Sequence, residues 1–299
     1  MALITPFDDF PIHQTAETLA VPSSSDRNHY DRYWFNGFSE EKDFLFEIGV
    51  GFYPNRHIMD AHFSISTAGK QYSYHASARM NPARYPINIG PISLEILEPM
   101  QKIRFSLKDP EKKLSCDLIF NAITEPHLEP KSLMIEGTRK ILETSRFTQF
   151  GKWDGSIETE SGNLDLTKEY GTRDKSWGVR PVGEPEIGAP GKLNAEPGVY
   201  WCWIPINFGD TFTHFGTFED HDGNSTQLSA DLVEISNNEV IKPLNNISHK
   251  VDWIKGTRWS SGAQISAQEG DKKIEINTKA CGPRFHCKGI GYQHPEWGH

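Results

Sequence analysis

The chain has 299 residues and a formal net charge of −9, with no block of basic residues, so nucleic acid is an unfavourable partner. Its hydrophobic content of 36% is modest, but 17 Phe, 9 Tyr and 8 Trp can fill a core or line an apolar cavity. With 25 Gly and 19 Pro along the chain, long helices are disfavoured and short strands joined by many turns are favoured.

Three further observations concern the compartment. The first ten residues have no basic start and no apolar run, so we expect no signal peptide. No stretch approaches 18 apolar residues, so we expect no transmembrane segment. The cysteines form no CxxC pair, and we expect them to be reduced thiols of a cytoplasmic protein; they are Cys116, Cys202, Cys281 and Cys287.

The first half of the chain predicts an arm followed by strands. Residues 1–30 carry three prolines and a serine run and are expected to form the arm. Apolar and polar residues then alternate with period two, which is typical of an antiparallel meander with one buried face. Gly49 and Gly51 interrupt one of these segments and indicate bending or a close backbone approach. The expected strands are 31–37, 44–52, 62–65, 72–75, 92–96, 103–107 and 114–122.

The second half continues in the same style. Residues 139–143 are expected to form a short helical turn, and the Pro/Gly-rich residues 181–198 a long loop. The further expected strands are 146–150, 153–158, 199–204, 213–218, 228–235, 249–254, 263–267, 273–278 and 285–292. About seven strands in each half predict an all-β chain of two tandem antiparallel barrels, with the arm at 1–30, one barrel at 31–160 and the other at 161–299.

Four motifs carry a family resemblance: DRYWFNG at 31–37, YPN at 53–55, TRDKSWGVRPVG at 172–183 and GIGYQHPEWGH at 289–299. They resemble a group of bacterial proteins of mostly unassigned function, similar in fold to carotenoid 1,2-hydratase (hydroxyneurosporene synthase) and to fungal Diels–Alderases. The resemblance implies two lipocalin-like barrels, with a ligand pocket in or between them. It also implies no metal and no organic cofactor, and apolar terpenoid, steroid or polyketide-like substrates.

The run GTRDKSWGVR, residues 171–180, is the leading candidate for the site. Asp174 is expected to act as a general acid or base, held by Arg173 or Arg180, with Trp177 as an apolar wall. The same residues equally suit a buried ion pair that joins two halves of the protein.

A second candidate group lies in the aromatic segment that follows the long loop. Trp201 and Trp203 share one face of their strand, and His214 lies on the expected neighbouring strand. An imidazole beside indole rings suits a proton shuttle, although a lone histidine is more often a core or surface residue.

The C-terminal tail and the first strand supply the remaining candidates. His294, Glu296 and Trp297 could add acid–base groups and a substrate contact, or could form a plug without chemistry. Tyr33 is a further candidate substrate contact. Asp60 and His62 share a face and are held in reserve, because such a pair is more often a solvated strand face. No close metal-ligand spacing occurs, so no metal is expected.

Two functions remain open from the sequence. The first is a cofactor-independent hydratase, dehydratase or isomerase, which acts on a hydrophobic small molecule by acid–base chemistry. The second is a carrier that binds such a molecule unchanged. Charged groups inside the pocket would favour the enzyme, because burying an unneeded charge is unfavourable. The sequence leaves a homodimer open.

Overall fold

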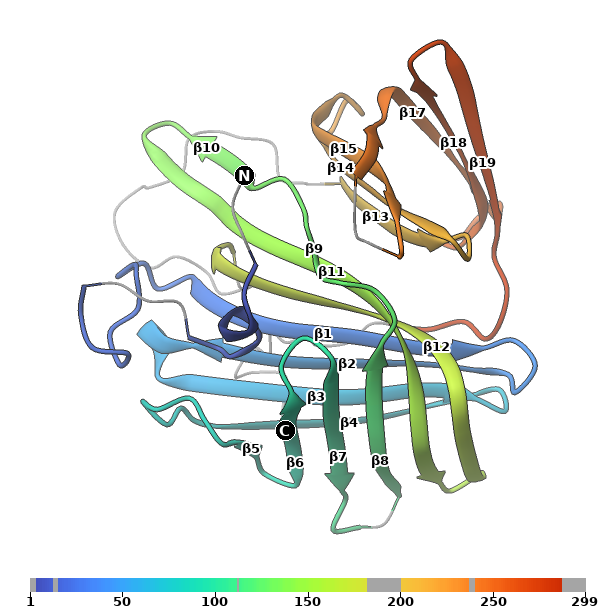
Figure 1. The fold of residues 1–299 in the computed structure, drawn as a ribbon. Helices are drawn as coiled ribbons and strands as arrows, with labels where there is room; N and C mark the ends of the chain where they lie inside the picture. Colours follow the sequence, from blue (N-terminus) through green and yellow to red (C-terminus); the bar gives the residue numbers. More distant parts are fainter. Residues whose placement is uncertain (1–3, 13–15, 112, 182–199, 237–239, 287–299) are drawn as a thin grey trace. The chain divides into compact units, whose positions relative to one another are not determined.

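The computed structural model of the chain describes residues 4–12, 16–111, 113–181, 200–236 and 240–286 (Figure 1). Nineteen antiparallel strands and two short 3-10 helices account for the regular structure of these residues, and no α-helix occurs among them. The 3-10 helices are η1 (Pro6–Asp9) and η2 (Pro54–Arg56). The prediction of an all-β chain with little helix is therefore confirmed.

The chain divides into two compact units. Residues 1–193 and 283–299 form the first, and residues 194–282 form the second. The boundary expected near residue 160 falls at the turn between β11 (Arg139–Thr159) and β12 (Gly162–Val179), which pair with each other within the first unit. No helix of the described residues is long and apolar enough to cross a membrane.

One antiparallel sheet forms the body of the first unit. Its other strands are β1 (His29–Ser39), β2 (Phe44–Tyr53), β3 (Ile58–Thr67), β4 (Lys70–Arg79), β5 (Ile87–Ile89), β6 (Ile92–Glu98), β7 (Lys102–Lys108), β8 (Leu114–Ala122), β9 (His127–Leu128) and β10 (Ser132–Glu136). The main path runs β4-β3-β2-β1-β12-β11-β8-β7-β6-β5, and β9 and β10 pair with β11. Because β5 also lies beside β3 and β4, the sheet curls into a nearly closed barrel.

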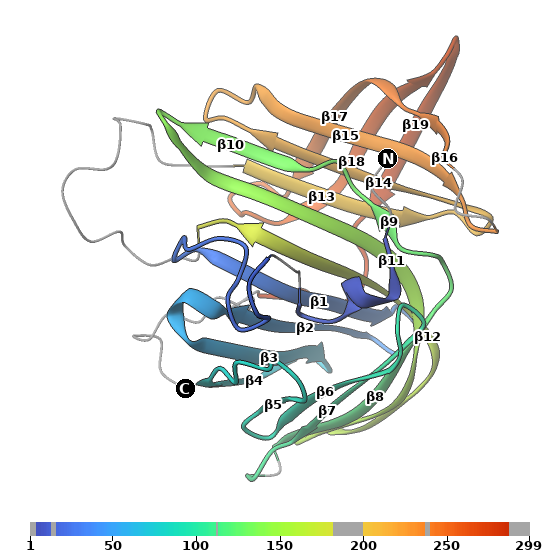
Figure 2. The same cartoon turned by 60° about the vertical axis from the view of Figure 1, so that its left-hand side comes forward.

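Strands β11 and β12 are the longest, and Figure 2 shows both bending along their length. The helical turn expected at residues 139–143 is wrong, since these residues begin β11 and pair with β10 on one side. The strands expected at 146–150 and 153–158 are likewise one continuous element. Pairing with β10 holds residues 139–143 in the strand, and from Glu143 onward β12 supplies a second partner; a local pattern does not reveal such pairing.

The interior of the barrel is filled by aromatic side chains. Trp153 is fully buried at its centre, and its ring centroid lies 5.6 Å from Phe35, 5.3 Å from Phe46 and 5.2 Å from Phe120, each in an edge-to-face arrangement. Such pairs stabilise a core beyond the area they bury. This region of the barrel is therefore a packed core and not a ligand cavity.

Three neighbouring glycines allow these rings to pack against the backbone of the sheet. Gly37, Gly171 and Gly151 lie opposite one another on β1, β12 and β11. A β-carbon at Gly171 would lie 2.3 Å from Nε1 of Trp153, and one at Gly151 would lie 2.2 Å from the Phe120 ring. The aromatic rings thus rest directly on the backbone, in the space that side chains would take elsewhere in a sheet.

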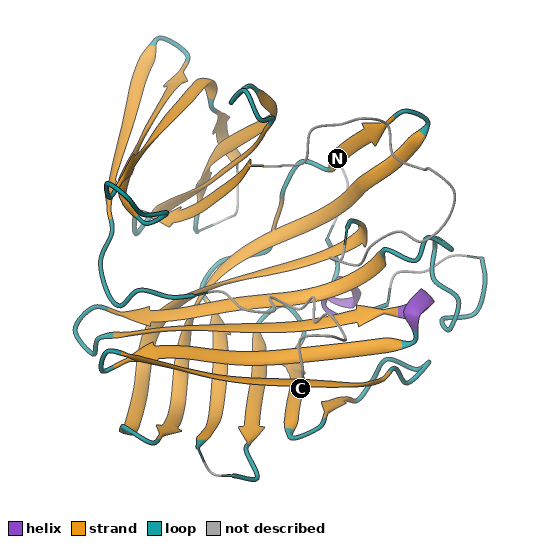
Figure 3. Ribbon diagram, turned by 180° about the vertical axis from the view of Figure 1, so that it is seen from behind, coloured by secondary structure: helices purple, strands orange, loops and turns teal. Residues whose placement is uncertain are grey.

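The second unit consists of two small antiparallel sheets. One has the order β13 (Tyr200–Asn207), β14 (Thr211–Glu219), β15 (Ser225–Glu234) and β16 (Val240–Pro243), and the other β17 (Asn245–Trp253), β18 (Ser260–Glu269) and β19 (Lys272–Lys279). Both sheets contribute to one apolar cluster, which includes Ala230, Leu244 and Ala267. Figure 3 shows no helix in this unit.

Two expectations for the ends of this region are only partly tested. Phe285 and His286 are not in a strand, although a strand was expected at 285–292, and the rest of that segment lies outside the described residues. The same holds for nearly all of the expected loop at 181–198.

Candidate functional site

The run GTRDKSWGVR lies in β12, where alternation sends its side chains to two faces. Arg173 and Lys175 stand opposite Phe35 and Tyr33 of β1 and share the inner face with them. Asp174 and Ser176 therefore point outward. The expectation that Arg173 holds Asp174 is wrong, because consecutive residues of a strand face opposite sides of the sheet.

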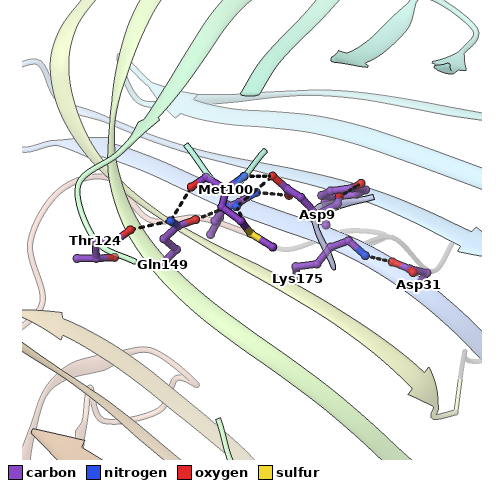
Figure 4. Close-up of polar contacts among 8 residues, drawn as sticks. Asp9, Asp31, Met100, Thr124, Gln149 and Lys175 are labelled. Carbon is purple, nitrogen blue, oxygen red and sulfur yellow. Dashed lines mark hydrogen bonds and ion pairs between the residues drawn. The ribbon is translucent and has the colours of Figure 1, made fainter. Parts of the chain in front are cut away.

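The inner arginine belongs to a closed hydrogen-bond network, drawn in Figure 4. Arg173 Nη1 lies 2.8 Å from Asp9 Oδ1, and Arg173 Nε donates to Gln149 Oε1 at 2.8 Å. The Gln149 amide donates to the carbonyl oxygens of Met100 and Thr124 at 2.8 Å and 2.6 Å. The Met100 backbone N–H donates to Asp9 Oδ2 at 2.6 Å. We call Asp9, Met100, Gln149 and Arg173 the N-terminal clasp, since they fasten η1 to the barrel.

Lys175 extends the inner network. Its ammonium pairs with Asp31 and lies 4.8 Å from the ring centroid of Tyr33 and 5.7 Å from that of Trp177. The Tyr33 hydroxyl donates to the Asp9 carbonyl oxygen at 2.5 Å. Burial, followed by the charges of Asp9 and Asp31, raises the pKa of Tyr33 well above its usual value. Tyr33 and Trp177 thus contact buried structural groups, and the Trp177 ring lies by Lys175.

Asp174 occupies a different environment on the outer face. It is 1% exposed, and its Oδ2 lies 3.4 Å from Arg32 Nη2 and 3.8 Å from Arg146 Nε. Arg146 also lies 3.7 Å from Glu129. Burial lowers the pKa of Arg146, but Asp174 and Glu129 raise it, and the net result lies above the usual value. Two guanidinium groups from β1 and β11, not Arg173 or Arg180, therefore accompany Asp174.

A carboxylate–imidazole pair lies on the same outer face. Glu47 of β2 accepts a hydrogen bond from Trp34 Nε1 at 2.7 Å, and its Oε1 lies 3.5 Å from His62 Nε2. The His62 ring stacks on His75 with a centroid distance of 5.7 Å. Glu47 and His62 are 4% and 1% exposed. This pair is the clearest acid–base group among the described residues of the first unit.

Two glycines of β2 lie on this outer face, between the side chains of β1 and those of β3. Gly49 lies between Trp34 and His62 in the register, and Gly51 lies between Arg32 and Asp60. A β-carbon at Gly51 would lie 2.8 Å from Asp60 Oδ1, so the glycine lets that side chain fold over the backbone.

We call this surface the outer polar strip; its members are Arg32, Trp34, Glu47, Asp60, His62, His75, Asp174 and Ser176. Six of them are buried to more than nine-tenths, namely Arg32, Glu47, Asp60, His62, Asp174 and Ser176. The outward face of a barrel sheet is ordinarily solvated, and buried charge is unfavourable unless it is paired. A concentration of buried ionisable groups on such a face is typical of a functional site.

The second unit brings its expected residues together. Trp201 and Trp203 share a face of the four-stranded sheet, and their rings stack with a centroid distance of 6.2 Å. His214 of β14 lies opposite Pro205 and Asp231 and so points to the same face. A ring nitrogen of His214 and a carboxylate oxygen of Asp231 are within 4.8 Å of each other.

The remaining expected residues do not join these groups in the described structure. The Arg180 guanidinium lies 5.6 Å from the ring centroid of Tyr30. His294, Glu296 and Trp297 lie outside the described residues.

Only weak sequence signals indicated the outer polar strip. Asp60 and His62, held in reserve as residues that share a face, both point outward from β3, and His62 Nε2 lies 3.5 Å from Glu47 Oε1. Glu47 was missed. Its signal is a single carboxylate in a strand that otherwise consists of apolar residues, two glycines and a tyrosine.

A separate cavity of about 460 Å³ opens at one end of the first barrel. It lies between β4, the loop that joins β7 and β8, and the turn that joins β11 and β12. Its lining is largely polar and includes Tyr72, Tyr74, Asp109, Glu111, Lys113 and Glu160. No sequence pattern indicated it.

Solved structures share the fold at low sequence identity. A protein of Nitrosomonas europaea (NE1406), provisionally assigned as ATTH, has a TM-score of 0.55 and 16% identity, with 79% of this chain and 77% of that chain covered. Kievitone hydratase of Nectria haematococca has a TM-score of 0.53 and 13% identity, with coverages of 86% and 82%. No curated protein sequence matches. The model of one family spans residues 4–299, and the chain belongs to that family, a family of unknown function (DUF8625).

Proposed function

We propose that this protein is a cofactor-independent hydratase, dehydratase or isomerase that acts on a hydrophobic terpenoid, steroid or polyketide-like molecule. The observation that carries the proposal is the buried pair of Glu47 and His62, with Oε1 and Nε2 3.5 Å apart. A carboxylate that orients an imidazole is a common arrangement for proton transfer. The Trp34 N–H fixes that carboxylate from the other side.

The pair suits chemistry that moves protons without redox change. In hydration, His62 donates a proton to one alkene carbon while a water molecule adds to the neighbouring carbon. Dehydration is the reverse. In isomerisation, the same group removes a proton at one carbon and returns it at another. Glu47 stabilises the imidazolium in each case.

Similarity in fold to a known enzyme supports the proposed enzymatic function by analogy. One similar structure is named a hydratase, and at 13% identity it shares the fold alone with this chain. For the second unit taken by itself, we propose that Trp201 and Trp203 contact a hydrophobic ligand, since stacked indoles offer a broad apolar surface. We propose His214, beside Asp231, as the acid–base group of that same unit.

The alternative function is a non-catalytic carrier of a hydrophobic ligand. A carrier cavity should be lined almost wholly by apolar side chains. In the first unit, however, Trp153 and its aromatic neighbours fill the barrel interior, and the buried outer polar strip carries charge. This distribution favours the enzyme.

An isotope experiment tests the proposal. The full-length protein is incubated with a panel of apolar alkenes, tertiary alcohols and enones in H₂¹⁸O and in D₂O, and the products are analysed by mass spectrometry. We expect incorporation of ¹⁸O or deuterium by the wild type. Glu47→Gln and His62→Gln should each lower the rate by about 10²- to 10⁴-fold.

The matched control is Glu95→Gln, because the Glu95 side chain is 57% exposed and lies outside the strip. It should leave the rate unchanged. Ligands recovered unlabelled from every variant, at equal stoichiometry, would identify a carrier instead.

A further inference from the structure

The carboxylate of Asp9 is held inside the barrel in the way that a bound anion would be. Its Oδ1 lies 2.8 Å from Arg173 Nη1, and its Oδ2 lies 3.5 Å from Arg173 Nη2 (Figure 4). The Met100 backbone N–H donates to the same Oδ2 at 2.6 Å. Asp9 and Arg173 are 0% and 1% exposed. A guanidinium and a backbone N–H that converge on one carboxylate form a preorganised position for an anion.

Apolar groups surround this position. The guanidinium carbon of Arg173 lies 5.3 Å from the ring centroid of Phe147 and 5.8 Å from that of Phe120, and both rings are buried. Met100 Sδ lies 3.6 Å from Arg173 Nη2. A carboxylate that carries an apolar body fits such surroundings, because its head pairs with the guanidinium while its body packs against the rings.

The neighbouring charges determine the charge of the occupant. Lys175 is also fully buried, but it is paired with Asp31. Arg173 is paired with Asp9. Without the Asp9 carboxylate, the position would therefore hold one uncompensated positive charge, which is unfavourable in a buried site and repels a cation. A monoanion restores neutrality, whereas a dianion such as phosphate would leave a buried negative charge in excess.

The segment that supplies Asp9 is not part of the sheet. We call residues 4–12 the η1 segment. Besides Asp9, the Pro11 carbonyl oxygen accepts a hydrogen bond from Arg84 Nη1 at 3.1 Å, and the Phe10 ring centroid lies 5.8 Å from that of Tyr85. The η1 segment can therefore leave the barrel without breaking any strand pairing.

We propose that Arg173 and the Met100 N–H form a binding site for a monocarboxylate with an apolar body, and that Asp9 fills this site when no such ligand is bound. The ligand displaces the η1 segment, so Arg173 keeps an anionic partner and Asp9 becomes solvated. One buried carboxylate replaces another, and the balance depends on the apolar surface that the ligand body buries.

This site is separate from the acid–base pair of the proposed function. Arg173 faces the barrel interior, whereas Glu47 and His62 lie on the outer face. The inference therefore goes beyond the proposed function and does not depend on it.

The tethered Asp9 carboxylate competes with the ligand. A group on a short flexible tether acts at an effective concentration on the order of millimolar, so the wild type should bind a free carboxylate weakly. If the η1 segment is released in less than about a tenth of the molecules, removal of the competing carboxylate should tighten binding by at least about 10-fold.

The first test measures binding of hydrocinnamate to the full-length wild type and to Asp9→Ala by titration calorimetry. We expect Asp9→Ala to bind at least about 10-fold more tightly. The uncharged probe, hydrocinnamyl alcohol, should show no such preference. Asp117→Ala is the matched control, because it removes a carboxylate 2.6 Å from Arg104 Nη2 in a half-exposed pair. It should bind as the wild type does. Equal binding of hydrocinnamate by the wild type and Asp9→Ala, or none by Asp9→Ala, overturns the inference.

Thermal unfolding shows whether a free carboxylate replaces that of Asp9, since Asp9→Ala leaves Arg173 unpaired. Unfolding is measured in sodium acetate and in sodium chloride of equal ionic strength. We expect acetate to raise the melting temperature of Asp9→Ala by several degrees relative to chloride, because a ligand that binds the folded state stabilises it. Asp117→Ala should melt equally in the two salts. An Asp9→Ala variant that gains nothing from acetate, or stays unfolded in it, contradicts the proposal.

Hydrogen exchange of the wild type distinguishes a ligand site from a purely structural ion pair. The Phe10 N–H donates to the Phe7 carbonyl oxygen at 3.1 Å, and the Ile12 N–H donates to that of Phe10 at 2.8 Å, so these amides report release of the η1 segment. We expect hydrocinnamate to accelerate exchange in residues 4–12 and not in β12, and the alcohol to change neither. Unchanged exchange of the η1 segment at about 100 times the dissociation constant of Asp9→Ala would mean that Asp9 is not displaced, and the inference fails.

Discussion

Arg173 and Asp174 are consecutive in the chain, yet their side chains belong to separate networks on opposite faces of β12. Arg173 pairs with Asp9 inside the barrel, and Asp174 pairs with Arg32 and Arg146 outside it. The inner network leaves each of its polar groups with a partner. The outer one leaves Asp174 Oδ1 without a hydrogen bond from the described residues. Stability and chemistry are therefore expected to respond to different members of one short motif.

Asp9→Asn should unfold the protein more easily without altering the chemistry. The change removes the charge that pairs with the fully buried Arg173, and breaking a buried pair typically costs about 3–5 kcal/mol. Denaturant or thermal unfolding measures the loss. Glu95→Gln removes an exposed charge and should change the free energy of unfolding by less than about 1 kcal/mol. Equal stability of the two variants would show that η1 is not held by the clasp.

Asp174→Asn should affect both stability and turnover. The variant leaves Arg32 with a weakened partner, whereas Arg146 retains Glu129. If Asp174 also accepts a proton, the rate per folded molecule should fall by about 10²- to 10⁴-fold. Unfolding curves and an activity assay on the same preparation separate the two effects. A destabilised variant with the wild-type rate per folded molecule would reduce Asp174 to a structural ion-pair partner.

Gly171→Ala should be among the most damaging of small substitutions. The new β-carbon would lie 2.5 Å from the Asn36 carbonyl oxygen and 2.3 Å from the Trp153 indole, so backbone or core must shift. Overpacking of this kind typically costs about 1–3 kcal/mol and occasionally more. Gly216→Ala, on a strand of the second unit, is the control, since its nearest neighbours are 3.8 Å away. Unfolding midpoints of both variants check the contrast.

The Asp109 loop should contribute to acid sensitivity. Asp109 accepts hydrogen bonds from the backbone N–H groups of Glu111, Lys113 and Leu114. Burial raises the pKa of Asp109, but these hydrogen bonds outweigh it, and the pKa lies below its usual value. The stabilisation is thus complete above the unfolded pKa of about 4 and is lost as the pH falls through the lower folded pKa.

Asp109→Asn tests this assignment. It should be less stable than the wild type at neutral pH and should lose less stability between about pH 4 and pH 2. Urea unfolding at a series of pH values measures how the free energy of unfolding changes with pH in each protein. If the free energy of unfolding falls with pH equally steeply in the wild type and in the variant, Asp109 does not contribute to acid unfolding.

Much of the fold followed from local alternation. The strands expected at 62–65 and 72–75 lie within β3 and β4, which form a hairpin; its turn residues Ala68 and Gly69 both have positive φ, at 50° and 73°. The start of β11 was misread, because Arg139 to Glu143 pairs with β10 in a hairpin whose two strands are joined by only two residues, and only Glu143 also pairs with β12. Local pattern does not report such partners.

The site was less predictable than the fold. The shared face of Trp201 and Trp203 followed from alternation within one strand. The pairing of Glu47 with His62 and of Asp174 with Arg32 depends on which strands are neighbours and in which register. The pairing of Asp174 with Arg32 joins β12 to β1 across more than a hundred residues, and no spacing within a motif encodes it. Glu47 and His62 lie on the consecutive strands β2 and β3, and their pairing depends on the register of that hairpin.

The clasp also has a consequence for the order of events during synthesis. Asp9 emerges from the ribosome 164 residues before Arg173, and β1 emerges well before β12, with which it pairs. At roughly 5–20 residues per second, that interval is about 8–33 s. Until β12 is made, one edge of β1 has no strand beside it and the carboxylate of Asp9 has no guanidinium. The first unit can therefore close only late in translation, and its β1 edge is the surface that a chaperone would have to cover in the nascent chain.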